Sequence, residues 1–583
     1  MSCRASPGLG CQSSVRPFTA TPISGLSRAN ARGASRPVAV CGSSSKGEVT
    51  LLDYGAGNVR SVRNAIHKLG YTIKDVSNVK DIENASRLIF PGVGAIGQAG
   101  ESITKAGYRE ALIDYIKVRG WSTVKKNIGY DGADKPFLGI CLGMQLLFEG
   151  SDENGGCEGL GIIPGQVNKF DPSIALPVPQ IGWNHLIPKH ESPFLNCIGD
   201  RRVYFVHSFC ARPTEANTDW VLATAEYGEE FVAMIQRGNV IATHGRPRAR
   251  HRAPRRRGGT PRGLARRVIA CLDVRANDAG DLVVTKGDQY DVREAKESAA
   301  DRGEVRNLGK PVELAGRYFE EGADEVAFLN ITGFRDCPLG DLPMLEVLRR
   351  ASEGVFVPLT VGGGIRGFTD AAGREHSALD VAAEYFRSGA DKVSIGGDAV
   401  YAAEDYYAHG AVPRGTTAIE AISQHYGAQA VVISIDPRRV YVASPEDTDH
   451  VTVKTATPGP NGEQYVWWQC TVKGGREGRD VDAVQLARCV ADLGAGEILL
   501  NCIDRDGAGT GFDLELVEAV SSAVAIPVVA SSGAGAPEHF ADVFRETHAA
   551  AALAAGIFHR REVGIDEVKQ CMADAGIPVR QGN

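Results

Sequence analysis

The first half of the chain alternates short apolar runs with segments of helical periodicity. An apolar run at residues 49–52 meets a turn, and Val62, Ile66 and Leu69 then recur at the spacing of one helix face. The apolar runs RLIFPG and KPFLGIC likewise end at turns that contain glycine. Alternating strands and helices of this kind favour an open parallel sheet. We therefore expect a first α/β domain over residues 48–245.

The second half carries an internal repeat. VIACLDV recurs as VVISIDP, GADEVAFLNIT recurs as GAGEILLNCID, and VPLTVGGGI recurs as IPVVASSGAG, in the same order. The matched positions are 273 and 436, 325 and 497, and 358 and 527, so the offset is nearly constant. With DKVSIGGDA and AALAAGIF added, the pattern predicts a (β/α)8 barrel with a two-fold internal repeat over residues 264–583. Long inserts are expected near 278–308 and 444–478.

Composition excludes several classes of protein. The chain has 583 residues, enough for more than one domain, and its net charge is −7, so any basic site must be local. Its 13 cysteines include no C-x-x-C pair and no zinc-like cluster with histidine. No stretch has the character of a membrane span. We therefore expect no metal and no organic cofactor, and neither nucleic acid nor a membrane as a partner.

Residues 1–47 differ from the rest of the chain. They hold five arginines, ten serines and no acidic residue before Glu48. This composition is typical of an organelle transit peptide and lacks the apolar block of a secretory signal. Because RPVAVCGSSS resembles a plastid processing region, we expect the chain to reach the chloroplast stroma. A plain disordered tail is the alternative.

Two aspartates lie at matching ends of repeated strands. Asp273 ends RRVIACLD, and Asp436 ends VVISID. Active sites of barrel enzymes lie at the C-terminal ends of the strands, where two facing carboxylates suit proton transfer, one as base and one as acid. A single aspartate at a strand end commonly caps the next helix, but a pair related by the repeat favours catalysis.

Two glycine-rich loops follow repeated strands. GGGIR spans residues 362–366, and SSGAG spans residues 531–535. Small residues let backbone N–H groups approach an anion, and the N-terminus of a following helix adds positive field. Two such loops predict a substrate with a phosphate at each end, and SIGGD and AAGIF would complete the two sites. The candidate residues are Gly363, Gly364, Ser532, Gly533, Gly535 and Gly556.

Two further residues are candidates at the same end of the barrel, its mouth, where the strands have their C-terminal ends. Lys286 lies in the long first loop, where a mobile lysine could close over a dianionic substrate. A solvated loop lysine is an equal alternative. Asp504 in CIDRDG also follows a strand, and we expect it to orient substrate or to bond locally.

Charged residues also precede strands at the opposite end of the barrel. Charges there are usually solvated or paired for stability. Their mixed signs, on what we expect to be alternate strands, allow a second interpretation, a ring across the barrel floor. The four residues are Arg267, Glu325, Lys392 and Glu497.

In the first half, GICLGMQ places Cys141 where a strand breaks into a helix, between Gly139 and Gly143. Glycines allow the strained turn that exposes a nucleophile, and a helix N-terminus favours thiolate. A lone cysteine is more often structural, but this context indicates a nucleophile. Residues 91–94, PGVG, could supply oxyanion donors. The thiol also needs a base with an orienting partner, and His207 in YFVHSF has no acid at a suggestive spacing.

Together these motifs resemble one family closely, the bifunctional imidazole glycerol phosphate synthases of plants, algae and fungi. That family fuses a class I glutamine amidotransferase to a cyclase barrel. The similarity covers nearly everything from residue 48 onward. It is carried by DYGAGN, PGVG, GICLGMQLLF, IGWN and YFVHSF in the first half, and by RRVIACLDVR, VVTKGDQYDVRE, TVGGGIR, ADKVSIG, VVISID, CTVKGGRE, GAGEILLNCIDRDG and SSGAG in the second.

For the first half, the resemblance implies a glutaminase. Cys141 would attack the side-chain amide of glutamine, form a glutamyl thioester and release ammonia. Gly92, Val93 and Gly94 would belong to the oxyanion and glutamine-binding site, and Gln145 would help to hold glutamine.

For the second half, the resemblance implies a cyclase. Ammonia would pass through the barrel, gated by the four charged residues at its floor. At the mouth it would meet phosphoribulosyl-formimino aminoimidazole carboxamide ribonucleotide, a bisphosphate, and Asp273 and Asp436 would carry the acid–base steps. The products would be imidazole glycerol phosphate, for histidine synthesis, and aminoimidazole carboxamide ribotide. We expect small-molecule substrates only, and a monomer with an internal domain interface.

One segment departs from the family pattern. The family places its catalytic histidine and glutamate in an HPEKS segment, shortly after a strand like GNVIAT. Here THGRPRAR follows that strand, and Arg246 and Arg248 stand where histidine and glutamate belong. His244 is out of register and lacks the acid. We expect an arginine-rich linker over residues 246–263, a damaged end to the amidotransferase domain, and impaired hydrolysis of glutamine.

Three explanations of this segment compete. A nucleic-acid arm would use its positive charge, but it has no aromatic residue for stacking and no accompanying motif. A genuine linker in an enzyme with an inactive glutaminase is the second. A gene-model or reading-frame error is the third, and the sharp compositional break before GLARRVIACLDVR favours it.

Two other functions stay open on the sequence. The sugar-phosphate isomerase of the same pathway shares the duplicated barrel and the paired aspartates, but it carries no fused thiol domain. A cyclase that uses free ammonia, with the first domain as a non-catalytic scaffold, would fit the missing base.

Overall fold

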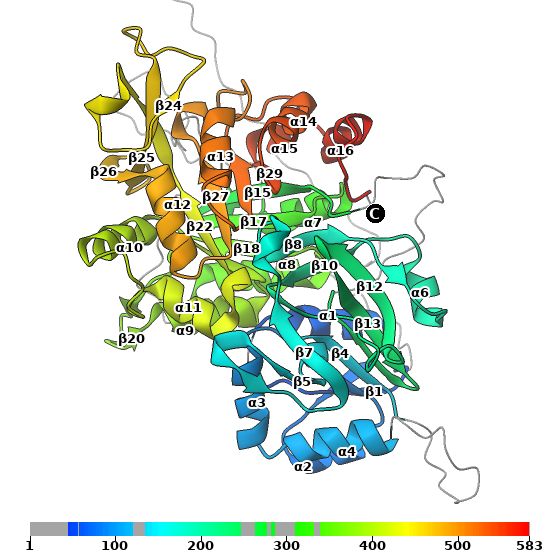
Figure 1. Cartoon of the computed structure of the whole chain (residues 1–583). Coiled ribbons are helices and arrows are strands. Elements are labelled where there is room, and N and C mark those ends of the chain that lie inside the picture. Colours follow the sequence, from blue (N-terminus) through cyan, green and yellow to red (C-terminus); the bar gives the residue numbers. More distant parts are fainter. Residues whose placement is uncertain are drawn as a thin grey trace, which may run out of the picture. The chain divides into compact units, whose positions relative to one another are not determined.

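The computed structural model describes residues 45–55, 57–119, 135–245, 263–276, 282–285, 309–331 and 339–581. These residues form two α/β regions in succession, coloured from blue to green and from green to red in Figure 1. The first 44 residues of the expected transit peptide and residues 246–262 of the arginine-rich segment lie outside the described residues. Within the described ranges, no helix is long and apolar enough to cross a bilayer.

An eight-stranded sheet organises the first region, in the order β2-β1-β3-β4-β14-β13-β12-β9. Neighbouring strands from β2 to β14 are parallel, as predicted, whereas β13, β12 and β9 pair antiparallel. The strands are β1 Glu48–Leu51, β2 Thr72–Asp75, β3 Leu88–Gly92, β4 Phe137–Cys141, β9 Ile187–Pro188, β12 Val221–Tyr227, β13 Glu229–Arg237 and β14 Val240–Thr243.

Short turns explain the antiparallel half of this sheet. β12, β13 and β14 follow one another through turns at Gly228 and Gly238, whose φ angles are +69° and +59°. Such short connections join only antiparallel neighbours, because a parallel crossover needs about a dozen residues or more. The predicted open sheet is therefore parallel from β2 to β14 and antiparallel from β14 to β9.

Helices and two smaller sheets complete the first region. Ile103 of α3 and Leu112 of α4 share a buried cluster with Phe90 of β3, so these helices pack on the large sheet. One small sheet has the order β11-β7-β5-β6, and β10 pairs with β8. The elements are α1 Arg60–Lys68, α2 Val79–Asn84, α3 Ile96–Lys105, α4 Arg109–Arg119, α5 Leu142–Gln145, α6 Pro193–Ile198, β5 Phe148–Ser151, β6 Cys157–Glu158, β7 Ile163–Lys169, β8 Gln180–Asn184, β10 Val203–His207 and β11 Phe209–Ala211.

The second region is the predicted barrel. Its parallel strands run β15-β17-β18-β21-β22-β27-β28-β29, and β29 pairs back with β15, which closes the sheet. The strands are β15 Arg267–Ala276, β17 Glu325–Asn330, β18 Leu359–Gly362, β21 Lys392–Ile395, β22 Val431–Ile435, β27 Glu497–Asn501, β28 Val528–Ser531 and β29 Ala551–Ala554, with β16 Leu282–Val284 antiparallel to β15. The helices are α7 Pro311–Glu320, α8 Pro343–Gly354, α9 Ala378–Ser388, α10 Gly397–Ala408, α11 Ala418–Tyr426, α12 Ala483–Asp492, α13 Leu514–Ser521, α14 Pro537–Glu546, α15 Gly556–His559 and α16 Ile565–Asp574.

Strand alternation decides which side chains face the barrel interior. A small buried cluster that includes Ile269, Cys271 and Val432 is separate from the larger core beneath the helices. Residues two apart on a strand face the same side. Asp273 therefore faces inward with Cys271, and the same alternation places Asp436 on the side of Val432.

Two inserts extend the barrel. A hairpin of β19 Phe368–Thr369 and β20 Glu375–His376 follows β18. Between β22 and α12 lies an insert sheet, made of β23 Pro437–Val442, β24 Val453–Lys454, β25 Tyr465–Val472 and β26 Glu477–Asp482. This sheet contains the expected insert at 444–478, whereas most of the expected insert at 278–308 lies outside the described residues.

Candidate functional site

Cys141 occupies a sharp turn between β4 and α5. Its φ angle is +54°, which residues with a side chain rarely adopt. Two glycines make room for the turn. A Cβ on Gly143 would lie 1.9 Å from the Phe90 carbonyl oxygen, and one on Gly139 would lie 2.6 Å from that of Gly143. The strained turn predicted from GICLGMQ is present, and such turns expose nucleophiles.

The PGVG segment lies beside this turn. Gly92 pairs with Cys141 in the register of β3 and β4, and Gly94 has a φ of +117°. The Tyr54 hydroxyl donates to the Val93 carbonyl at 2.7 Å, and burial raises the pKa of Tyr54, so the donor stays protonated. The segment is therefore held next to the thiol, where backbone N–H groups could stabilise an oxyanion.

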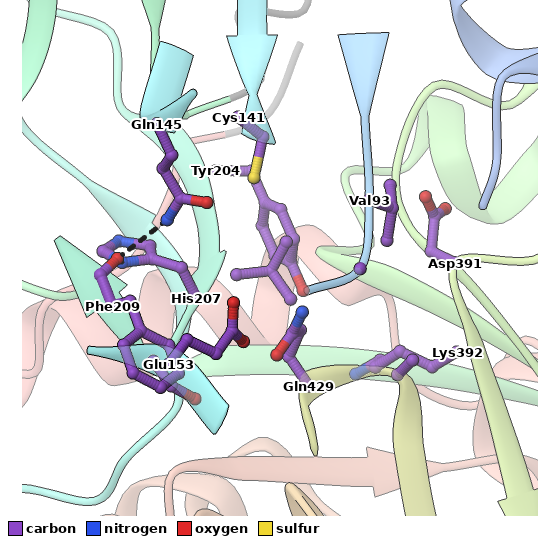
Figure 2. A pocket seen from close by; sticks show the side chains of 14 residues that line it. Val93, Cys141, Gln145, Glu153, Tyr204, His207, Phe209, Asp391, Lys392 and Gln429 are labelled. Carbon is purple, nitrogen blue, oxygen red and sulfur yellow. Dashed lines mark hydrogen bonds between the residues drawn. The ribbon is translucent and has the colours of Figure 1, made fainter. Parts of the chain in front are cut away.

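A cavity reaches from the Cys141 turn to the barrel. Cys141, Gln145, Glu153 and His207 line it from the first region, and Lys392 is among the residues that line it from the barrel (Figure 2). Lys392 begins β21. The nucleophile candidate and the floor of the barrel thus share one cavity.

Gln145 and Glu153 bring polar groups to this cavity. The Gln145 amide donates to the Phe209 carbonyl at 3.0 Å (Figure 2). Glu153 accepts from the Ile96 backbone N–H at 2.8 Å, and burial raises the pKa of Glu153. The sequence did not single out Glu153, because a carboxylate in a turn has no diagnostic spacing. Only the fold brings it to the cavity of Cys141, where a carboxylate suits the amino group of an amino acid.

Two histidines stack at this end of the molecule. The rings of His207 and His244 lie 3.8 Å apart, and His244 Nε2 lies 3.1 Å from the Gln145 amide nitrogen. Burial lowers the pKa of His207 well below its usual value and that of His244 to about 3. Among the described residues, His207 Nε2 and His244 Nδ1 have no hydrogen-bond partner. Neither histidine is therefore oriented by an acid from that part of the chain.

Four charged residues at the strand starts form a closed ring of ion pairs. Arg267 contacts Glu325 at 2.7 Å and Glu497 at 2.5 Å, and Lys392 contacts the same carboxylates at 2.7 and 2.5 Å. No member is more than 2% exposed. Tyr204 of β10 donates to Glu325 at 2.9 Å. The members begin β15, β17, β21 and β27, so they do not lie on strictly alternate strands as expected.

Glu497→Gln is expected to destabilise the fold by about 3–5 kcal/mol, because it leaves two buried cations with a single carboxylate. Chemical denaturation at neutral pH measures the loss. The surface pair of Glu384 and Arg387 offers a control, since Glu384→Gln should cost less than about 1 kcal/mol. Equal losses in the two variants would contradict the expectation.

The same ring predicts the direction of acid sensitivity. Burial by itself raises the pKa of Glu325, but Arg267 and Lys392 outweigh it and lower that pKa to about 2. A carboxylate with a depressed folded-state pKa stabilises the fold above its unfolded value, and this contribution is lost as the pH falls through the folded-state pKa. The ring therefore favours the folded state throughout the neutral range.

At the opposite end of the barrel, Asp436 directly follows β22. Its Oδ1 accepts from Asn501 Nδ2 at 2.8 Å and from the Ser434 hydroxyl at 3.4 Å. Burial raises the pKa of Asp436 in spite of these bonds. A carboxyl group with a raised pKa is better suited to exchange protons near neutral pH. Asp273 faces the same interior from β15, and its backbone carbonyl accepts from Thr285 N–H at 2.8 Å.

The two glycine-rich loops share a backbone conformation, in keeping with the repeat. Gly363 and Gly364 have φ angles of +92° and +75°, and the corresponding Ser532 and Gly533 have +73° and +97°. A serine held at positive φ is strained, and such strain clusters at functional sites. The pair of loops therefore presents similar backbone surfaces on both sides of the barrel mouth.

The other mouth candidates differ in their placement. Gly556 begins α15, whose N-cap residue Ala555 makes no side-chain cap bond. Gly535 lies in the second glycine-rich loop. Lys286 lies outside the described residues. Asp504 is exposed beyond β27 and accepts from the Arg439 backbone N–H at 2.7 Å. This bond reaches a residue of the insert sheet 65 positions earlier in the chain, so it is not the local bond that the sequence suggested.

Comparisons with known proteins agree with this division of the chain. A glutamine amidotransferase class-I family matches residues 50–244, and a histidine biosynthesis protein family matches residues 267–564. Neither match includes residues 245–266.

Two relatives align along nearly the whole chain. The chain is 57% identical over 554 residues to imidazole glycerol phosphate synthase hisHF, chloroplastic, of Arabidopsis thaliana, which covers 92% of this chain and 90% of the relative. It is 51% identical over 558 residues to imidazole glycerol phosphate synthase hisHF of Schizosaccharomyces pombe, and this alignment covers 91% of this chain and 99% of the relative.

A third relative aligns with the barrel half alone. The chain is 42% identical over 318 residues to imidazole glycerol phosphate synthase subunit HisF of Mycobacterium tuberculosis, covering 54% of this chain and 96% of the relative. The identity to the fused relatives across both halves decides between the synthase and the isomerase considered above. The chain belongs to the bifunctional imidazole glycerol phosphate synthase family of histidine biosynthesis, with a glutamine amidotransferase domain and a cyclase domain on one polypeptide.

Proposed function

We propose that Asp273 and Asp436 form the acid–base pair of the cyclase reaction at the barrel mouth. Their inward placement on repeat-related strands and the raised pKa of Asp436 support this assignment. The substrate would be the bisphosphate phosphoribulosyl-formimino aminoimidazole carboxamide ribonucleotide. The products would be imidazole glycerol phosphate and aminoimidazole carboxamide ribotide.

The two glycine-rich loops would hold the two phosphates. Their shared positive φ angles support this role, because successive N–H groups in such a backbone would turn toward one side, where an anion could bind. The uncapped starts of α10 at Gly397 and α15 at Gly556 would add further donors. A substrate with one phosphate at each end would then span the mouth between the repeat-related sites.

Ammonia would reach the mouth through the barrel. The observation that carries this proposal is the cavity shared by Cys141 and Lys392. Because Lys392 belongs to the ion-pair ring, the ring would stand between the glutaminase site and the barrel interior. Passage of ammonia would require these ion pairs to separate, so the ring would act as a gate.

In the first domain, Cys141 would attack the glutamine amide. Gly92, Val93 and Gly94 would stabilise the oxyanion, and Gln145 would hold the substrate. A second candidate function is a cyclase fed by free ammonia, with this domain as a scaffold. The two neutral histidines, which no acid of the described residues orients, favour that candidate.

Labelled ammonia tests the cyclase assignment. The purified chain, the bisphosphate substrate and ammonium labelled with heavy nitrogen are incubated above neutral pH, and the products are analysed by mass spectrometry. We expect the label in the imidazole product and none in the ribotide. Unchanged bisphosphate in the presence of saturating ammonium would rule the proposal out.

We further propose the organisation of the whole chain. Residues 1–47 would be a transit peptide for the chloroplast stroma, and the name of the Arabidopsis relative supports that destination. The amidotransferase domain would span 48–245, the arginine-rich linker 246–263 and the cyclase barrel 264–583. Contacts such as Asn58 to the Gly389 carbonyl and Asn64 to the Ser352 carbonyl, both at 2.9 Å, support a monomer with an internal interface.

A further inference from the structure

A buried ion pair joins the insert sheet to the loop that follows β27. Arg439 of β23 donates from Nε to Asp513 at 2.7 Å and from Nη2 at 2.5 Å. The Arg439 side chain is 5% exposed and that of Asp513 is fully buried. Nη2 also donates to Glu515 at 2.9 Å, and the guanidinium lies over the Trp468 ring. Bidentate pairs of this kind fix geometry as well as contributing energy.

Arg439 holds both ends of the loop at residues 502–513. At the far end, Asp513 caps α13 by accepting from the Leu516 N–H at 3.2 Å. Burial by itself raises the pKa of Asp513, but Arg439 outweighs that effect and the pKa is lowered. Near the start, Asp504 accepts from the Arg439 backbone N–H at 2.7 Å. The loop is therefore anchored twice to one residue of the insert sheet.

Between these anchors, the loop packs directly on the second glycine-rich loop. Gly511 N–H donates to the Gly533 carbonyl at 2.8 Å. A Cβ on Gly533 would lie 2.2 Å from the Gly511 carbonyl oxygen, and one on Gly535 would lie 2.1 Å from that of Gly509. Backbone lies against backbone here, so a displacement of one loop must displace the other.

We propose that Arg439 is a positioning residue for the phosphate site at residues 531–535. Arg439 would act through the anchored loop rather than by touching substrate. The inference rests on the proposed phosphate-binding role of the second glycine-rich loop. A contact that holds the phosphate equally in the ground state and in the transition state lowers KM without raising kcat, so weakening such a contact through Arg439 should raise KM and spare kcat.

Steady-state cyclisation with saturating ammonium tests this role in the full chain. Arg439→Met is expected to raise KM for the bisphosphate about tenfold or more and to change kcat by less than about threefold. Arg439→Lys keeps the positive charge but cannot make the bidentate pair, so its KM should lie between those of Arg439→Met and wild type. Arg479→Met is the control, because Arg479 pairs with Glu404 in a similar bidentate manner and its other ion-pair partner is Glu477, not the loop at 502–513. It should leave both constants within about twofold.

Hydrogen exchange provides a second readout that needs no turnover. In Arg439→Lys, the amides of residues 502–513 and 531–535 should exchange faster than in wild type, whereas Arg479→Met should not change them. Unchanged KM and unchanged exchange in the Arg439 variants would overturn the inference, as would equal effects of the Arg479 variant. If wild-type protein itself failed to cyclise, the proposed function would fail, and the exchange result would still decide the loop contact.

Discussion

Asp436→Asn is expected to lower kcat of ammonium-dependent cyclisation by about 10²–10⁴-fold, the usual cost of losing a general acid or base. Asparagine can retain an oxygen for the Asn501 amide, which donates to Asp436 at 2.8 Å, so the local structure should survive. What the substitution removes is the ability to exchange a proton. Initial rates at saturating bisphosphate measure the effect.

The same substitution should raise stability at neutral pH. Burial raises the pKa of Asp436, so the folded state binds this proton more tightly than the unfolded state does. Stability from such a group is present below its unfolded pKa and is lost as the pH rises through the folded-state pKa. Ionised Asp436 therefore destabilises the fold at neutral pH. Asp436→Asn removes that cost, and its melting temperature should exceed that of wild type.

A control separates the proton-transfer role from general damage. Asp492, at the end of α12, accepts from the Tyr406 hydroxyl at 2.7 Å, away from the interior of the barrel. Asp492→Asn should leave kcat within about twofold. Undiminished cyclisation by Asp436→Asn would contradict the acid–base assignment, and a joint loss of activity and stability would point to unfolding instead.

Glutamine is expected to support cyclisation about 10²–10⁴-fold more slowly than saturating ammonium does. From the sequence, we expect Arg246 and Arg248 to stand where the family resemblance implies the catalytic histidine and glutamate. His244 does not substitute for them, because burial lowers its pKa to about 3 and its Nε2 faces the Gln145 amide. Parallel assays with the two nitrogen sources measure the ratio.

Cys141→Ala tests whether the ammonium-dependent reaction is independent of the glutaminase site. It should leave the ammonium-dependent rate within about twofold of wild type, since the cyclase does not need the thiol. Equal and fast turnover of wild type with glutamine and with ammonium would refute the predicted deficit. An intact mass of the native protein, or the transcript across residues 240–268, would show whether the arginine-rich segment is present in the cell.

Patterns in the sequence were enough to indicate the two candidate sites, the turn at Cys141 and the barrel aspartates. The glycines at 139 and 143 indicate the turn at Cys141, because a side chain at either position would collide with a nearby carbonyl oxygen. The internal repeat predicts the barrel. Because side chains alternate along a strand, Asp273 and Asp436 are then expected to face its interior. These features appear in the sequence as glycine positions and as a repeated pattern, so they can be found before it is known which distant segments touch.

The remaining features depend on contacts between distant segments. The antiparallel half of the first sheet arises from two short turns, and Glu153 reaches the Cys141 cavity only because β5 and η1 Glu153–Gly155 fold beside it. The ion-pair ring exists because barrel closure brings four strand starts to one axis. The Arg439 and Asp513 pair joins strand β23 of the insert sheet to the loop that precedes α13. The sequence could place the four ring residues at strand starts, but which groups pair there, and which residues meet in the other contacts, is set by packing rather than by spacing.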